Sequence, residues 1–103
     1  MCVAIPDNVT LIGSNAFSYC TSLTSVVIPD SVVSFGNYAF EGCNNLMSIY
    51  YKGTASDWAE ISFGYLSSNL TNATRYYYSE NQPTDTTYNW WHYDQDGNIA
   101  VWE

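Results

Sequence analysis

Apolar and polar positions along the first half of the chain follow one pattern that returns after 23 residues. The windows 5–27 and 28–50 are identical at ten positions, which include an Ile-Pro-Asp triplet and an Ala-Phe pair. At two further positions one apolar residue replaces another, Ile12 by Phe35 and Val26 by Ile49. A fixed period in the twenties predicts a solenoid, in which each coil buries its apolar side by stacking on the next coil.

Each repeat contains the pattern of one short strand. Leu-x-x-Val-x-Ile at 23–28 recurs as Leu-x-x-Ile-x-Tyr at 46–51, a spacing that points alternate side chains inward. Pro6 and Pro29 close their strands because proline offers no ladder donor, and the aspartate after each proline is suited to cap the turn that follows. One such strand per coil predicts a parallel ladder.

The rest of each coil carries residues suited to close stacking. Gly13 and Gly36 recur where the chain turns tightly or where the backbone of another coil comes close. Phe17 and Phe40 each follow an alanine, so a small and a large apolar residue alternate in every coil. We expect the two phenylalanine rings to stack along the wall opposite the strands.

These residues resemble the BspA-like leucine-rich repeats, which occur in tandem on bacterial cell-surface proteins and in some parasitic protists. The shared motif is Ile-Pro-Asp-x-Val-x-x-Ile/Phe-Gly-x-x-Ala-Phe-x-x-Cys-x-x-Leu-x-x-Val/Ile, read at 5–26 and again at 28–49. The resemblance implies a leucine-rich-repeat β-solenoid. It also implies an adhesin or surface-recognition protein at an extracellular location, whose partner is a protein or glycan of a host or neighbouring cell.

The first coil lacks the beginning of its strand. Val3-Ala4-Ile5-Pro6 aligns with residues 26–29, and the expected leucine before it is missing. Stacked repeats need covered ends. We therefore expect either a fragment of a longer array or a surface that another chain completes, and the open edge also permits a homodimer.

The repeat decays beyond residue 50. Thr54 with Asp57 three residues later, followed by Trp58 and Ile61, predicts a capped short helix over the last coil. Residues 67–69 are polar and predict a loop, and the β-branched and aromatic segment 73–78 predicts a strand that adds a rung to the ladder.

The last residues predict an antiparallel β-hairpin. A polar connector, 80–87, leads to two aromatic and apolar runs, 88–93 and 98–102, on either side of an Asp-Gly turn. The segment from Tyr50 onward resembles the one that commonly closes arrays of these repeats. The expected organisation is thus repeat coils over 1–51 and a degenerate repeat with a C-terminal cap over 52–103, in one structural domain.

Composition and charge narrow the functional classes. The chain of 103 residues is 47% hydrophobic and 17% aromatic, which favours one small folded domain. Two basic residues against ten acidic ones give a net charge of −8, which excludes nucleic-acid binding and suits a secreted surface protein. No stretch is long and apolar enough for membrane insertion.

Candidate catalytic residues are few. The single His92 and the three cysteines would form a Cys-His site only in contact, and the stacked coils place Cys20 and Cys43 away from the final hairpin. We expect these two cysteines to stack as small apolar residues in adjacent coils, where the geometry would also permit a disulfide between them. The sequence has no zinc spacing, phosphate loop or nucleophile elbow. It therefore predicts a protein without enzymatic activity, metal or cofactor.

Three hypotheses for function remain. In the first, the concave ladder face binds a partner through its outward-pointing residues, which are Thr24, Ser25, Val27, Met47, Ser48 and Tyr50. In the second, the chain is a purely structural cap of a longer array. In the third, Trp91, Tyr93 and Trp102 act as a carbohydrate- or choline-binding groove, since their segment is similar to one unit of the aromatic hairpin repeats that bind choline or glucan.

Overall fold

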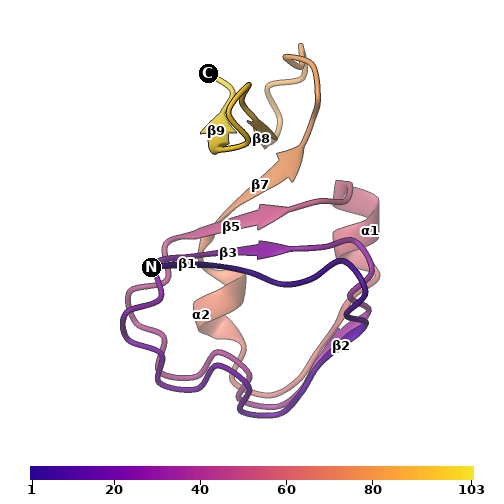
Figure 1. Ribbon diagram of the computed structural model, residues 1–103. Helices are drawn as coiled ribbons and strands as arrows, with labels where there is room; N and C mark the ends of the chain where they lie inside the picture. Colours follow the sequence, from indigo (N-terminus) through magenta and orange to yellow (C-terminus); the bar gives the residue numbers. More distant parts are fainter.

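The computed structural model describes all residues, 1–103, as a short solenoid with a hairpin above it (Figure 1). Its main sheet has six strands. They lie in the order β1 (Cys2–Ala4), β3 (Ser25–Ile28), β5 (Ser48–Tyr51), β7 (Thr74–Tyr78), β8 (Asn89–Tyr93) and β9 (Ile99–Val101). All neighbours are parallel except β8 and β9, which are antiparallel. The parallel ladder of stacked coils is that of a solenoid, as the repeat in the sequence predicts.

The register of the ladder follows the sequence repeat. Ser25 of β3 lies opposite Ser48 of β5, and Val26 lies opposite Ile49. Backbone hydrogen bonds between coils extend beyond the strands, as from the Lys52 amide to the Ile28 carbonyl at 2.9 Å. Equivalent residues of successive coils therefore stand side by side in columns.

A second ladder on another side of the coils was not expected from the sequence. It consists of β2 (Leu11–Ile12), β4 (Ser34–Phe35) and β6 (Ser62–Phe63), all parallel. Two-residue strands fall below any clear strand pattern. The sequence did carry one signal of this ladder. Ile12 and Phe35 are apolar residues at equivalent positions of the two repeats, and they pair in it.

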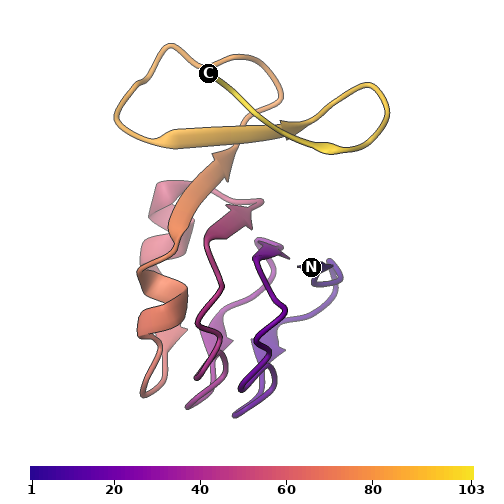
Figure 2. The same ribbon diagram turned by 90° about the vertical axis from the view of Figure 1, so that its left-hand side faces the viewer.

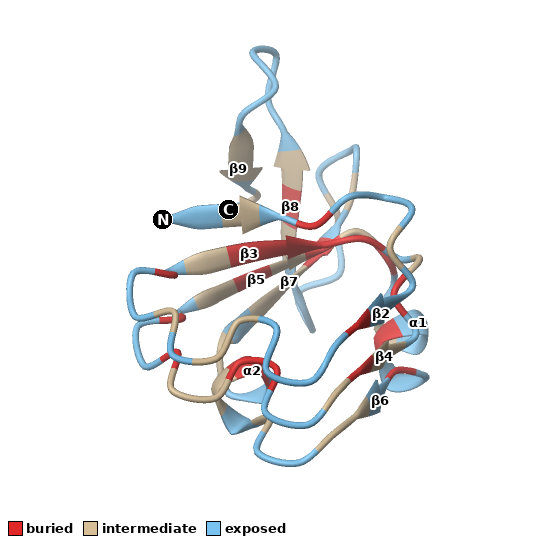
Figure 3. Ribbon diagram, turned by 60° about the horizontal axis from the view of Figure 1, so that its bottom comes forward, coloured by how far each residue is buried: buried red, intermediate tan, exposed pale blue.

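The core lies between the two ladders (Figure 3). Seventeen buried residues form it, with Val26 and Ile28 on the inner side of β3 and Leu23 just before this strand. The rings of Phe17 and Phe40 stack with centroids 5.0 Å apart, which confirms the predicted column of phenylalanines. Face-to-face stacking of equivalent rings requires that each coil repeat the last with little rotation.

Close backbone approach between coils explains one of the two recurring glycines. A Cβ on Gly36 would stand 2.5 Å from the Ser14 nitrogen of the preceding coil, which confirms the prediction there. Gly64 is equally confined by the backbone of Asn37. A Cβ on Gly13 would meet nothing within 4 Å.

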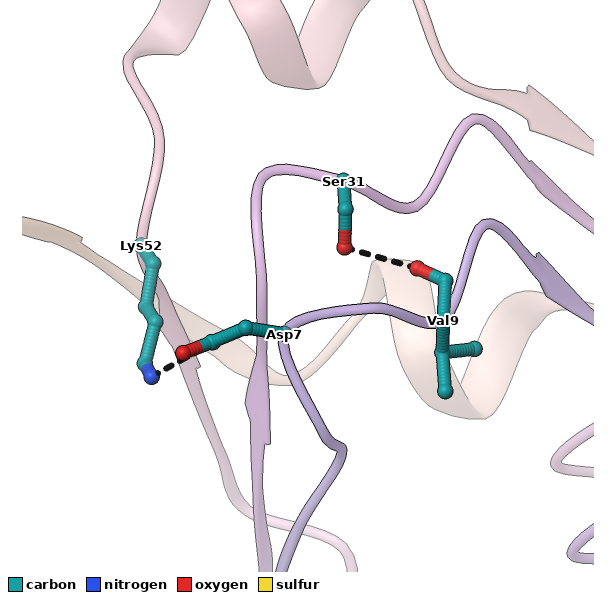
Figure 4. A network of polar contacts seen from close by, with 4 residues as sticks. All are labelled: Asp7, Val9, Ser31 and Lys52. Carbon is teal, nitrogen blue, oxygen red and sulfur yellow. Dashed lines mark hydrogen bonds and ion pairs between the residues drawn. The ribbon is translucent and has the colours of Figure 1, made fainter.

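The turn after each strand is not capped as expected. Neither Asp7 nor Asp30 accepts a hydrogen bond from the turn backbone, because the Val9 and Val32 amides bond to the carbonyls of the prolines instead. The link between these turns is the Ser31 hydroxyl, which donates to the Val9 carbonyl of the preceding coil at 2.7 Å (Figure 4).

Two short helices follow the ladder. The predicted helix is confirmed as α1 (Ala55–Ala59), where the Thr54 hydroxyl and the Asp57 carboxylate each accept from the other's backbone amide. The predicted loop at 67–69 is wrong, because one helical turn, α2 (Ser68–Thr71), forms there. Burial of Leu70, which is 1% exposed, draws this polar segment against the core.

The predicted strand at 73–78 is confirmed as β7, and the chain then rises to β8 and β9 across the end of the ladder (Figure 2). The connecting turn is held by the Asp94 carboxylate, which accepts hydrogen bonds from the backbone amides of Asp96 and Asn98.

Trp91 of β8 fixes this hairpin to the coils. Its side chain is fully buried, and its Nε1 donates to the Tyr51 carbonyl of β5 at 2.8 Å.

We expect Gly36→Ala to destabilise the fold by roughly 1–3 kcal/mol, because the new methyl group would force the coils apart. Gly13→Ala is the matched control, since its methyl group meets no neighbour. Urea denaturation of both variants checks the prediction. Equal losses of unfolding free energy would show that coil contact is not the cause.

We expect Trp91→Phe to lower the free energy of unfolding by about 2 kcal/mol, because a buried ring shrinks and a hydrogen bond to Tyr51 is lost. Trp102→Phe provides the comparison. Trp102 is only half-buried, so we expect Trp102→Phe to lower the free energy of unfolding by less in the same denaturation experiment. The order of the two variants would be reversed if Trp91 contributed little to docking.

Alkaline unfolding should depend on Tyr51. Burial, with the nearby Asp57 and Asp30 carboxylates as smaller causes, raises the pKa of Tyr51 to about 12. Because the unfolded side chain ionises near pH 10, the stabilisation is complete below that pH and is lost as the pH rises toward 12. Between pH 9 and pH 11.5, the free energy of unfolding should fall less for Tyr51→Phe than for the parent chain. Denaturation at the two pH values measures this difference.

Candidate functional site

The side of the six-stranded sheet that faces away from the core carries most of the predicted contact residues. We call it the outer face. Because side chains alternate along a strand, two columns of residues lie on it. The first column contains Ser25, Ser48 and Thr74, and the second contains Val27, Tyr50 and Tyr76.

The start of the outer face is open to solvent. Met47 is 66% exposed and Thr24 is exposed, while Ser25 and Ser48 are half-buried between them. These four residues come from two adjacent coils and lie next to one another because β3 and β5 are in register. A large apolar side chain therefore stands free among small polar ones.

The other end of the outer face is covered, which corrects one predicted contact residue. Val27 is 2% exposed, yet it lies outside the inner core cluster. Its neighbour in the ladder, Tyr50, is half-buried, with its ring 5.2 Å from Tyr76 and edge-on to Trp91 at 5.7 Å. The hairpin thus closes this part of the sheet, and Val27 cannot contact a partner.

The predicted groove of three aromatic residues does not form. Trp91 is buried, and Trp102 stacks on His92 with ring centroids 3.7 Å apart. Trp91 and Tyr93 point to one side of the hairpin and His92 points to the other, so Trp102 lies on the wrong side to join them. Of the three aromatic residues, only Tyr93 is exposed, at 40%.

A cleft that the sequence did not reveal lies between the coils and the hairpin. Its volume is about 420 Å³, and its lining residues are Asp7, Asp30, Lys52, Tyr78 and Tyr93. The two aspartates occupy equivalent positions of successive coils. The signal in the sequence was the third coil, where Lys52-Gly53 replaces the Pro-Asp of the first two.

One ion pair crosses this cleft. The Lys52 ammonium lies 2.9 Å from the Asp7 carboxylate, two coils away (Figure 4). The same ammonium lies over the Tyr93 ring, 5.9 Å from its centroid. The hydrogen bond to Asp7 raises the pKa of Lys52, so the lysine is charged at all physiological pH values.

The other basic residue, Arg75, is occupied within the fold. Its guanidinium lies 4.7 Å from the centre of the Trp58 ring, and its Nε donates to the Tyr77 hydroxyl at 2.9 Å. A smaller hollow of about 230 Å³ beside it is lined by Thr71, Thr87, Tyr88 and Asn89 among others. The contacts of Arg75 are those of a packing residue.

The nucleophile and base candidates are apart. His92 is stacked in the hairpin, whereas the Cys43 thiol is buried in its coil and donates to the Phe17 carbonyl. Burial raises the pKa of the Cys43 thiol, which opposes formation of a reactive thiolate. Cys20 is half-buried and all three cysteines are free. No Cys-His pair is formed.

No helix of the structure has the length and apolar character needed to cross a membrane.

Comparison with known proteins gives one match. Residues 2–83 match the family model described as BspA type Leucine rich repeat region (6 copies). Neither a curated protein nor a solved structure matches the chain. The match covers both clear repeats, the degenerate third coil and β7, which is most of the 103 residues. The chain therefore belongs to the BspA type leucine-rich repeat family.

Proposed function

We propose that this chain is an extracellular recognition module that binds a protein on a neighbouring or host cell through the open part of its outer face. Members of its family are commonly surface-associated and bind proteins, and such repeats typically serve as binding scaffolds without enzymatic activity. The net charge of −8 suits a secreted protein that does not bind nucleic acid.

The observation that carries this proposal is the exposure of Met47. Methionine is enriched at protein interfaces, and an unbranched side chain that is 66% exposed adapts to varied partner surfaces. Ser25 and Ser48 beside it supply small hydrogen-bonding groups, whereas the Thr24 hydroxyl is bonded to Met1. The flat face has no enclosed pocket there, so it suits a partner that contacts an area.

The competing function is purely structural. The Trp91 side of the hairpin packs on Tyr50, which lies beside the buried Val27 in the ladder, as expected of a segment that ends an array. The aromatic hairpin as a carbohydrate- or choline-binding site has less support, because Trp91, Tyr93 and Trp102 do not face one another. Pairing of a second copy along the sheet edge at β1 stays a prediction, for sedimentation analysis to test.

We expect Met47→Glu to weaken binding of the chain to its partner by about tenfold or more, because a charge would enter the apolar contact. The measurement is binding to an array of purified surface and matrix proteins, printed beside a glycan array. Leu11→Glu is the matched control, since Leu11 is 62% exposed on the second ladder. Absence of any binding partner at high protein concentration would favour the structural function.

A further inference from the structure

We propose that the cleft between the coils and the hairpin binds a basic side chain, arginine or lysine, of a protein partner. Its lining residues are the two repeat aspartates Asp7 and Asp30, together with Lys52, Tyr78 and Tyr93. The inference rests on the proposed protein-binding function and adds the chemistry of the partner.

The cleft carries an unbalanced charge. Lys52 is bonded to Asp7, and this is the one ion pair of the chain. Asp30, on the coil between them, accepts no hydrogen bond and has no cationic partner. The cleft therefore holds two carboxylates and one ammonium, which leaves one negative charge for a ligand to neutralise.

The cleft already accommodates one cation, the ammonium group of Lys52. The Lys52 ammonium is held by the Asp7 carboxylate at 2.9 Å and by the face of the Tyr93 ring at 5.9 Å. Carboxylate and aromatic face together are the groups that recognise an ammonium or guanidinium. Lys52 shows this chemistry on one side of the cleft, and Asp30 with Tyr78 offers the same two groups without a cation.

The aromatic walls of the cleft, Tyr78 and Tyr93, are preorganised. Tyr78 and Tyr93 are 37% and 40% exposed, so each shows part of its ring to solvent. Each also packs edge-on against the buried Trp91, at centroid distances of 5.2 Å and 5.0 Å. Because Trp91 is fixed to Tyr51 by a hydrogen bond, little side-chain entropy is lost when a ligand contacts these rings.

A saccharide fits the cleft less well. Sugar rings stack on a free aromatic face, whereas the Tyr93 face is taken by Lys52. An unpaired carboxylate gains more from a charged donor than from a hydroxyl. The whole chain, with ten acidic and two basic residues, also draws cations toward it over long range.

The test uses the intact chain and two synthetic hexapeptides that differ at one residue, arginine or its neutral isostere citrulline. Amide chemical shifts in NMR report binding residue by residue. We expect the arginine peptide alone to shift the amides of Asp30, Lys52, Gly53, Tyr78 and Tyr93. Equal shifts with citrulline, or shifts spread over the acidic surface, would overturn the proposal.

Variants give effects of opposite sign. Asp30→Asn should weaken binding of the arginine peptide by about five- to tenfold, because the free carboxylate is lost. Lys52→Gln should strengthen it, because Asp7 becomes available as well. Glu41→Gln is the control for Asp30, since it removes one charge from another corner of the coil and its amide oxygen can still accept from the Tyr19 hydroxyl. An equal effect of Glu41→Gln and Asp30→Asn would contradict binding of the peptide in the cleft.

Two further measurements keep the outcomes distinct. If Asp30→Asn fails to fold, Tyr78→Leu replaces it, with an expected loss of about threefold from the missing ring face. Short oligosaccharides that shift the cleft amides while the arginine peptide does not would make this a glycan site and overturn the proposal. Failure of the peptide test would leave the Met47 experiment unaffected, because that experiment concerns the open outer face.

Discussion

The fixed register between coils is the constraint on which the rest of this molecule depends. Residues 23 apart in the first two repeats lie opposite each other in the main ladder, and the second ladder and the phenylalanine column keep the same alignment. Gly36 permits the separation at which these contacts form, because any side chain there would meet the backbone of the coil before it. Backbone spacing thus decides the placement of every exposed side chain.

Much of the solenoid could be predicted because its signals are local or repeated. The capping box of α1 needs only Thr54 and Asp57, and the stacked rings follow from two phenylalanines at equivalent positions. The missed elements depend on distant contacts. Nothing near Ser68 in the sequence indicates a helix, since the turn forms where Leu70 enters the core. Two-residue strands such as β2 exist only through their pairing.

The candidate sites show the same division. Ser25 and Ser48 follow from alternation along the strands, whereas Thr24 and Met47 stand just before the strands, where alternation does not decide the direction of a side chain. Val27 was misplaced because its burial depends on how the hairpin folds back, which strand patterns do not encode. The position of Trp102 was within reach of the sequence, since alternation along the hairpin already places it opposite Trp91. Lys52-Gly53 marked a departure from the repeat, but the cleft itself could not be foreseen, because the coil residues that line it and those of β7 and β8 are 26 or more residues apart in the chain.

The Lys52–Asp7 ion pair alters how this solenoid should respond to heat or to mechanical load. Stacked repeats usually behave as a linear system in which each unit is coupled to its nearest neighbours alone. Here a side chain of the third coil reaches the first and passes over the second. The hydrogen bond from Trp91 to Tyr51 connects the last segment to the ladder in a similar way. With these longer couplings, the coils would open together as one cooperative unit rather than fray one by one from an end.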